Sequence, residues 1–235
     1  MVEVVPPTAD EKPLIVASMF GNTTQCVSAA KHILEKAGYE VLVFHSTGMG
    51  GRIMESLIES GLVSGVLDVT TTEWADELVG GILGSGPTRL EAAGKAGIPA
   101  VVAPGCLDMV NFGEPATVPA KFAGRLFYQH NPQVTLMRTN AEENAELGRI
   151  LAEKVNAYTA PATLLLPLRG VSVISAEGGS FYQPDSDHAL FEAVRHHARP
   201  GLPVLEVDTT INDTAFSEAA AEALLKNIAA SKQAP

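Results

Sequence analysis

The sequence predicts an α/β fold built on a doubly wound, mainly parallel sheet of about seven strands. Short apolar runs such as PLIVAS and ATLLLP alternate with stretches of helical periodicity along most of the chain. Runs that are apolar throughout, rather than at every second residue, are typical of parallel strands buried on both faces. A (β/α)8-like barrel is the alternative, because seven or eight βα units could also close into a ring.

Each predicted element has its own local signal. Apolar runs bounded by turn residues predict strands at 13–18, 40–45, 65–69, 99–105, 133–138, 162–167 and 203–208. Apolar residues at helical spacing predict helices at 23–38, 50–61, 72–81, 87–97, 187–197 and 214–232. Another helix follows Asn140, which can cap it with Glu143 at the capping-box position. Residues 106–131 are irregular, and a loop of that length is usually functional or wrongly assigned.

The domain organisation and composition exclude several classes of protein. Residues 1–12 are expected to form a flexible lead-in, and residues 13–235 a single α/β domain. Hydrophobic residues make up 46% of the chain, which is enough for a sizeable core. The net charge of −11 and the lack of a Lys/Arg cluster argue against nucleic-acid binding.

Cysteine usage and hydropathy suggest the compartment. Cys26 and Cys106 lie far apart without a CxxC motif, so we expect no disulfide framework and a reducing environment. No window approaches the ~20 apolar residues of a membrane span, and the N-terminus lacks the pattern of a signal peptide. We therefore expect a cytoplasmic protein without membrane partners.

The carboxyl ends of the predicted strands are rich in hydroxyl and titratable side chains. Parallel sheets bind ligands at this edge, so these residues are the candidates for a site. As catalytic candidates we take His45, Asp68, Glu73 and His130. As candidates for substrate or anion binding we take Ser18, Thr47, Gly48, Gly50, Gly51, Thr70, Thr71, Thr72, Arg89, Asp108, Asn111, Asn131 and Arg138.

A glycine-rich turn, HSTGMGG (45–51), joins the second predicted strand to a helix. Glycine amides at a helix N-terminus can hold an anion, and Thr47 could cap the helix. The G-x-G-G spacing, with Asp68 placed 20 residues after Gly48, partly matches the dinucleotide pattern. Ile53 replaces the third glycine and no GK[ST] follows, so both a dinucleotide fingerprint and a P-loop are disfavoured. An anion-holding turn and a turn that only packs the helix remain as interpretations.

Two further turns carry groups that could bind a substrate. Thr70 to Thr72 follow a strand, where they can cap a helix and still offer hydroxyls, with Glu73 in its first turn. Pro87 favours the first position of a helix, which would place Arg89 in the first turn as a clamp for a carboxylate or phosphate. An ordinary cap and a surface salt bridge are the alternatives.

Histidines and a cysteine supply the remaining chemistry. His45 and His130 have the right pKa for acid–base work near neutral pH, although a lone histidine is more often structural. A divalent metal could bind His45, Asp68, Glu73 and His130, but no HxH or HExxH spacing supports such a site. Cys106 could be a nucleophile, although no base is spaced to activate it and a buried structural thiol is the alternative.

Long motifs give the chain a family resemblance. FHSTGMGGRIMESLI, GVLDVTTTEWADELVGG, GPTRLEAAGKAGIPAVVAPGCLDMVNFG, HNPQVTLMRTNAEEN and INDTAFSEA resemble the second half of the tomato mosaic virus resistance protein family and its bacterial homologues. The resemblance covers nearly the whole chain from Leu14 on. It implies two α/β halves in a full-length member, with the ATP site in the first half, which is absent here. We therefore assign no ATP contact and no certain cofactor.

Two hypotheses of function follow. The first is a cytosolic hydrolase or lyase that acts on a small oxygenated acid or ketone. In it Glu73 or His45 is the general base, Asp68 orients the histidine, His130 protonates the departing group, and the glycine amides with Arg89 or Arg138 hold the anionic group.

The second hypothesis is a non-catalytic or site-completing subunit whose partner chain supplies the ATP-binding half. A dinucleotide- or phosphate-binding module is a further alternative. A missing half would leave an apolar face exposed, so we also expect a homo-oligomer.

Overall fold

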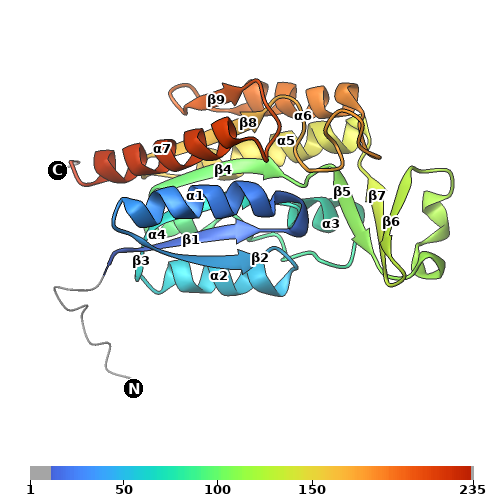
Figure 1. The fold of residues 1–235 in the computed structure, drawn as a ribbon, viewed down its shortest axis with the longest axis horizontal. Helices are drawn as coiled ribbons and strands as arrows, with labels where there is room; N and C mark the ends of the chain where they lie inside the picture. The colour runs from blue at the N-terminus through green and yellow to red at the C-terminus, as the bar shows by residue number, and fades with distance from the viewer. Residues whose placement is uncertain (1–11, 234–235) are drawn as a thin grey trace, which may run out of the picture.

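The computed structural model describes residues 12–233, which form two sheets and seven α-helices (Figure 1). The larger sheet has six strands, all parallel, in the order β2 (Glu40–His45), β1 (Leu14–Met19), β3 (Val63–Thr70), β4 (Ala100–Gly105), β8 (Ala162–Pro167) and β9 (Val204–Val207). The smaller sheet is antiparallel, in the order β5 (Met109–Phe112), β7 (Val134–Arg138) and β6 (Phe127–Asn131). The predicted α/β class and the mainly parallel sheet are confirmed.

One predicted strand lies in a different place from the one expected. Residues 133–138 form β7 in the antiparallel sheet, so the parallel sheet has six strands rather than about seven. An apolar run has the same local pattern in both sheets, and only its pairing partners distinguish them. The segment 106–131 is also more ordered than expected, since it supplies β5 and β6. Except for Lys12, the predicted lead-in of residues 1–12 lies outside the described residues.

The helices cover both faces of the larger sheet. They are α1 (Thr24–Lys36), α2 (Met49–Glu59), α3 (Glu73–Val79), α4 (Ala92–Ala96), α5 (Ala141–Asn156), α6 (Pro184–His197) and α7 (Thr214–Ser231). Helices α1 and α7 pack together on one face, and the core of the opposite face draws on α2 to α6. The capping box predicted at Asn140 and Glu143 is present at the start of α5.

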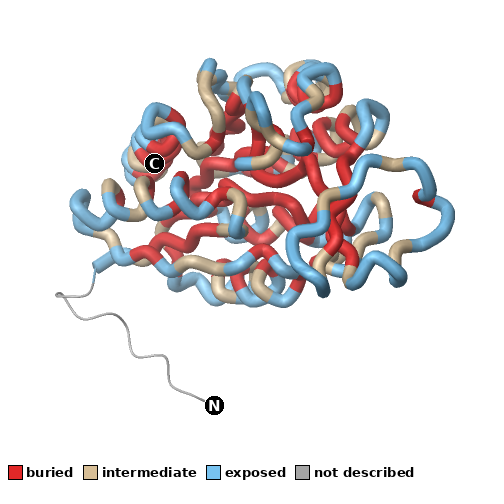
Figure 2. Tube along the Cα trace, turned by 45° about the vertical axis from the view of Figure 1, so that its right-hand side comes forward, coloured by how far each residue is buried: buried red, intermediate tan, exposed pale blue. Residues whose placement is uncertain are grey.

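The strand period of two explains the two cores. Ile15 and Ala17 of β1 face the core shared with α1 and α7, whereas Val16 between them faces the opposite core. All three have no exposed surface, so the apolar run is continuous because each face is covered by helices. Figure 2 shows these strands as a buried interior beneath more exposed helices and loops.

The strand order defines where a ligand site is expected. From β1 the chain crosses to β2 on one side, and then to β3 on the other side of β1, so the winding reverses between β1 and β3. Ligands of open α/β sheets bind at the carboxyl ends of the strands, near such a reversal. The antiparallel sheet stands beyond these same ends (Figure 1), so the chain builds extra structure at the edge where a site is expected.

Candidate functional site

Arg89 lies at the centre of a buried network of carboxylates, which we call the Arg89 network: Arg89, Asp68, Glu73 and Glu55. The Arg89 guanidinium donates two hydrogen bonds to Asp68, of 2.6 and 2.7 Å. It also donates to Glu73 over 2.7 Å and to Glu55 over 3.2 Å. Burial opposes ionisation of Arg89, but the facing carboxylates outweigh it and raise its pKa well above the ordinary value. Arg89 therefore holds three carboxylates together and is 2% exposed.

The segment around Arg89 differs from the prediction. Residues 87–90 form turns, and α4 begins only at Ala92, so Arg89 is not in a first helical turn. Leu90 has a positive φ of 71°, which is incompatible with a right-handed helix at this residue. The Glu55 carboxylate accepts hydrogen bonds from the backbone amides of Leu90, Glu91 and Ala92, and so caps the start of α4. Burial raises the pKa of Glu55.

The glycine-rich turn holds an anion that belongs to this chain. The amides of Gly48 and Gly51 donate to Glu73 Oε1 over 2.8 and 3.1 Å. A Cβ on Gly51 would lie 2.3 Å from Glu73 Oε2, and one on Gly50 would lie 1.7 Å from the carbonyl oxygen of His45. The first residues of α2 are thus capped by Glu73 rather than by Thr47, which is exposed. In this structure the Glu73 carboxylate caps α2 and pairs with Arg89.

The hydroxyls at the ends of β1 and β3 extend the Arg89 network. Ser18 Oγ donates to Asp68 over 2.6 Å and accepts from the amide of Thr70 over 2.8 Å. The hydroxyl of Thr70 lies 2.8 Å from that of Thr23, and Thr71 donates to the carbonyl oxygen of Ala103. Thr72 precedes α3, but its buried hydroxyl makes no hydrogen bond. The structure therefore gathers Ser18, Asp68, Thr70, Glu73, Arg89 and the glycine turn into one contiguous group.

Four of the sequence-predicted residues are exposed and make no contact with the Arg89 network. His45 at the end of β2 and Thr47 are exposed, and Asp68 contacts Arg89 and Ser18 rather than a histidine. His130 and Asn131 are exposed on β6 of the antiparallel sheet, where Asn131 accepts from the amide of Gln133. The sequence did not show that His130 and Asn131 lie apart from the other candidates, because it did not predict that β6 and β7 belong to a separate antiparallel sheet.

A second buried arginine, Arg138, contacts polar groups at another part of the carboxyl edge of the larger sheet. Arg138 donates to the carbonyl oxygen of Phe181 over 2.9 Å and to Asp187 Oδ1 over 2.5 Å. Ser172 donates to Asp108 Oδ2 over 2.8 Å, and Asp108 Oδ1 is buried without a partner. We call this set the Arg138 network: Arg138, Asp187, Asp108 and Ser172. It joins β7, the turn after β4, the loop after β8 and the first turn of α6.

The carboxyl groups of the Arg138 network have raised pKa values. Burial raises the pKa of Asp187 to about 7, and the charge of Asp108 adds to the shift, against the opposing effect of Arg138. Burial also raises the pKa of Asp108. Cys106 is fully buried at the end of β4 with a φ of 60°, and burial and the Asp108 charge raise the pKa of its thiol well above the ordinary value. Asp187 is thus a carboxyl group suited to proton transfer near neutral pH.

A cavity of about 430 Å³ borders this network, and we call it the carboxyl-edge cavity. It is lined by Leu168, Arg169, Ser175, Glu177, Tyr182, Pro184, Asp187 and Thr210. These residues follow β8 and β9 or begin α6, so the cavity lies at the carboxyl edge of the sheet, although away from the reversal between β1 and β3. Sequence reasoning missed Asp187, Ser175 and Tyr182. The available signal was the long segment 168–183 after a predicted strand, whose length is typical of functional loops.

Asn111 belongs to neither network. Its amide nitrogens donate to Asp76 over 2.8 and 2.7 Å, which ties β5 to α3. Burial raises the pKa of Asp76 to about 7, against the hydrogen bonds from Asn111. The buried side-chain oxygen of Asn111 makes no hydrogen bond.

Within residues 12–233, no three His, Cys, Asp or Glu side chains lie in an arrangement that could hold a metal ion. In the same residues, no helix combines the length and apolar composition needed to cross a membrane. Both cysteines are free and buried.

Comparison with known proteins places these motifs in a family. The model of the C-terminal domain of the uncharacterised protein family UPF0261 matches residues 12–228. A UPF0261 protein of Clostridium tetani is 54% identical over 221 residues, which cover 94% of this chain and 55% of the relative. One from Rhizobium meliloti is 49% identical over 216 residues, covering 90% of this chain and 54% of the relative.

A plant protein is also similar. The ToMV resistance protein Tm-1(GCR237) of Solanum lycopersicum is 43% identical over 213 residues, which cover 89% of this chain and 28% of the tomato protein. The chain spans about half the length of the bacterial relatives it matches. The extent and identity of these matches show that the chain belongs to the UPF0261 family and corresponds to its C-terminal domain.

Proposed function

We propose that this chain forms the substrate site of an enzyme, a hydrolase or lyase that acts on a small oxygenated acid or ketone by general acid–base chemistry. The observation that carries the proposal is Asp187, whose carboxyl group lines the carboxyl-edge cavity with a pKa of about 7. A group with this pKa exchanges a proton readily at neutral pH. The volume of about 430 Å³ suits a small molecule.

The surroundings of Asp187 assign roles to its neighbours. Arg138 fixes one carboxylate oxygen of Asp187, so the other is the atom that would take or give a proton. Tyr182 lines the same cavity and is exposed, so it can bind a carboxylate or carbonyl oxygen of the substrate. Arg169 is also exposed there, and it can do the same by leaving its solvent-exposed pair with Asp208. In this proposal the acid–base role passes from Glu73 to Asp187, because Glu73 is already held by Arg89 and two glycine amides.

The test is a binding screen followed by an assay. The purified chain is screened by thermal shift against small hydroxy acids, keto acids and ketones, and each hit is then incubated and followed by NMR for turnover. A ligand at about 100 times its Kd should raise the free energy of unfolding by roughly 2.7 kcal/mol, which is several degrees in Tm. Asp187→Asn keeps the shape of the side chain and should lower turnover by about 100-fold or more.

Asp185→Asn is the matched control. Asp185 lies in the same first turn of α6, is exposed, and is not among the residues that line the carboxyl-edge cavity. The proposal is contradicted if both variants turn over a substrate at the wild-type rate.

A second candidate function is completion of a site in a partner chain, and exposed apolar side chains favour it. The matches cover most of this chain but only about half of each bacterial relative. Met49 and Ile53, one turn apart on α2, are 62% and 50% exposed, and Ile82 is 64% exposed. Apolar side chains of this size suit an interface. The partner in this proposal is a chain with the remaining half of the family, which by the resemblance would bind ATP.

Light scattering tests the second candidate. The chain is mixed with the part of the Clostridium tetani relative that the match leaves out, and the mass of the complex is measured. Ile53→Ser should weaken the complex, whereas Ser56→Ala at an exposed position of the same helix should not. A chain that stays monomeric alone and in the mixture would contradict both this interface and the expected homo-oligomer.

A further inference from the structure

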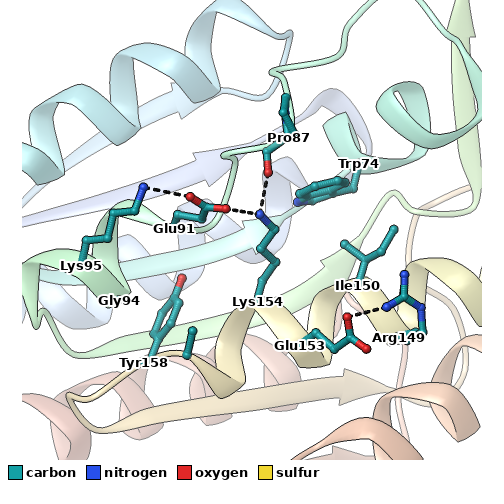
Figure 3. A pocket seen from close by; sticks show the side chains of 11 residues that line it. Trp74, Pro87, Glu91, Gly94, Lys95, Arg149, Ile150, Glu153, Lys154 and Tyr158 are labelled. Atoms are coloured by element: carbon teal, nitrogen blue, oxygen red, sulfur yellow. Dashed lines mark hydrogen bonds and ion pairs between the residues drawn. The ribbon is translucent and has the colours of Figure 1, made fainter.

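A further cavity lies away from the carboxyl-edge cavity. It measures about 590 Å³ and is formed by α5, α4 and the segment that precedes α4 (Figure 3). Trp74, Pro87, Glu91, Lys95, Lys154 and Tyr158 are among its lining residues. It shares no lining residue with the carboxyl-edge cavity, so a ligand here would not compete directly with a substrate there.

Two side chains of this cavity have an N–H group without a hydrogen-bond acceptor. Trp74 is 7% exposed, and its buried indole N–H makes no hydrogen bond. A buried indole N–H usually finds an acceptor, and leaving it without one is costly. Lys154 donates to the carbonyl oxygen of Pro87 over 2.5 Å and to the carboxylate of Glu91, which uses two of the three N–H groups of its ammonium.

The two donors are close together. The Lys154 ammonium lies 5.1 Å from the centroid of the Trp74 ring. Figure 3 shows the indole nitrogen on the side of the ring that faces this ammonium, with Pro87 and Glu91 completing the surroundings of Lys154. An acceptor with two oxygens could take one hydrogen bond from each donor. A carboxylate has this form, and its charge would be favoured beside an ammonium.

The charge of the lining residues and the apolar walls of the cavity suit an aromatic carboxylate as the ligand. Lys95, Arg149 and Lys154 outnumber Glu91 and Glu153, so the lining is net positive in a chain whose net charge is −11. Tyr158 and Ile150 add an apolar wall. Tyr158 is fixed by a 2.8 Å hydrogen bond to the carbonyl oxygen of Leu90, and its ring fits against α4 because Gly94 has no Cβ.

We propose that this cavity is a second ligand site, which binds a small aromatic carboxylate. One carboxylate oxygen accepts from the indole N–H of Trp74 and the other from Lys154, and the aromatic ring packs against Tyr158 and Ile150. Lys154 is partly exposed, and its flexible stem can move to admit the ligand.

Trp74 is the only tryptophan of the chain, so its fluorescence reports on this cavity alone. The full chain is titrated with benzoate, with acetate and with benzyl alcohol, and the emission of Trp74 is followed. Benzoate should give a saturable change. Acetate lacks the ring and benzyl alcohol lacks the charge, so each should bind at least about tenfold more weakly. Calorimetry with benzoate provides a second readout that does not depend on fluorescence.

Substitutions separate the proposed contacts from a general effect of charge. Lys154→Met keeps most of the side-chain stem over Trp74 but removes the ammonium donor. It should lower the affinity for benzoate by at least about tenfold. Lys95→Met is the matched control: Lys95 also pairs with Glu91 and lines the cavity, but its side chain is 62% exposed. It should change the affinity far less. Asp187→Asn, at the carboxyl-edge cavity, should leave the benzoate response unchanged.

Three outcomes would overturn the proposal. The first is no saturable response to benzoate in the millimolar range by fluorescence and calorimetry. The second is equal affinity for benzoate and benzyl alcohol, which would show that no carboxylate contact exists. The third is equal loss of affinity in the Lys154 and Lys95 variants. If Lys154→Met fails to fold, as judged by circular dichroism, the three probes on the wild-type chain still decide between these results.

Discussion

The Arg89 network and the Arg138 network are built from the same chemical groups but are completed differently. Arg89 and Arg138 are the two largest fully buried side chains among the described residues. Around Arg89, the carboxylates of Asp68 and Glu73 also accept from Ser18 and from glycine amides. Around Arg138, Asp108 keeps one oxygen without a partner, and Asp187 borders a cavity.

The difference separates a structural role from a chemical one. A buried charge whose hydrogen bonds are all made is held in one position. A buried carboxyl group that borders a cavity can exchange a proton with a ligand there, and burial raises its pKa. The Arg89 network therefore secures the glycine turn to the sheet, and the Arg138 network is where acid–base chemistry is proposed.

Removal of the guanidinium of Arg89 should have the largest effect. Arg89→Met leaves the carboxylates of Asp68 and Glu73 buried without their ion-pair partner, which should lower the free energy of unfolding by about 3–5 kcal/mol. Urea unfolding followed by circular dichroism measures the loss. Arg169→Met is the control, because its pair with Asp208 is exposed at 64% and 69% and should leave the free energy of unfolding nearly unchanged. Similar losses in both variants would refute a structural Arg89 network.

A methyl group on Gly51 should break the internal cap. Its Cβ would lie 2.3 Å from Glu73 Oε2, so Gly51→Ala must displace the carboxylate and should cost about 1–3 kcal/mol of unfolding free energy. Gly21→Ala is the control, since no atom lies within 4 Å of its Cβ position, and should stay within about 0.5 kcal/mol of wild type. An unchanged Gly51→Ala variant would mean that Glu73 does not occupy the turn in solution.

Asp187 should make stability depend on pH. Burial raises its pKa from an ordinary value of 3.8 to about 7 in the folded state, so the folded chain binds more protons between these pH values. The free energy of unfolding should therefore fall as the pH rises through this window, with at most about 1.4 kcal/mol per pH unit from one group. Asp187→Asn should remove this contribution and leave that of Asp76, which has a similar pKa.

Urea unfolding at several pH values measures this effect. The difference between the wild-type and Asp187→Asn curves isolates the contribution of one carboxyl group. Parallel curves between pH 4 and pH 7 would show that Asp187 titrates normally and would remove it as the acid–base group.

The two thiols should be unreactive in the folded chain. Burial raises the pKa of Cys26 to about 12 and that of Cys106 well above its ordinary value, so neither forms a thiolate at neutral pH. Iodoacetamide should label no cysteine in the folded chain and both after denaturation, as mass spectrometry would show. Rapid labelling of Cys106 alone would instead support the nucleophile considered from the sequence.

Local sequence patterns account for much of the fold. Six of the seven predicted strands lie in the parallel sheet, and Asn140 caps α5 with Glu143 as its spacing indicates. Such features depend on residues a few positions apart, so periodicity and cap chemistry are enough to predict them. The remaining predicted strand, 133–138, was assigned to the wrong sheet, because the choice of pairing partner leaves no local pattern in the sequence.

The candidate site required the tertiary structure. The sequence alone determined that hydroxyl and charged groups follow the strands and that a glycine turn can hold an anion. It did not determine that the anion is Glu73, 22 to 25 residues away, or that Asp187 meets Arg138 across 49 residues. Those pairings, and the pKa shifts that follow from burial, are set by how the packed elements exclude water, which only the folded chain decides.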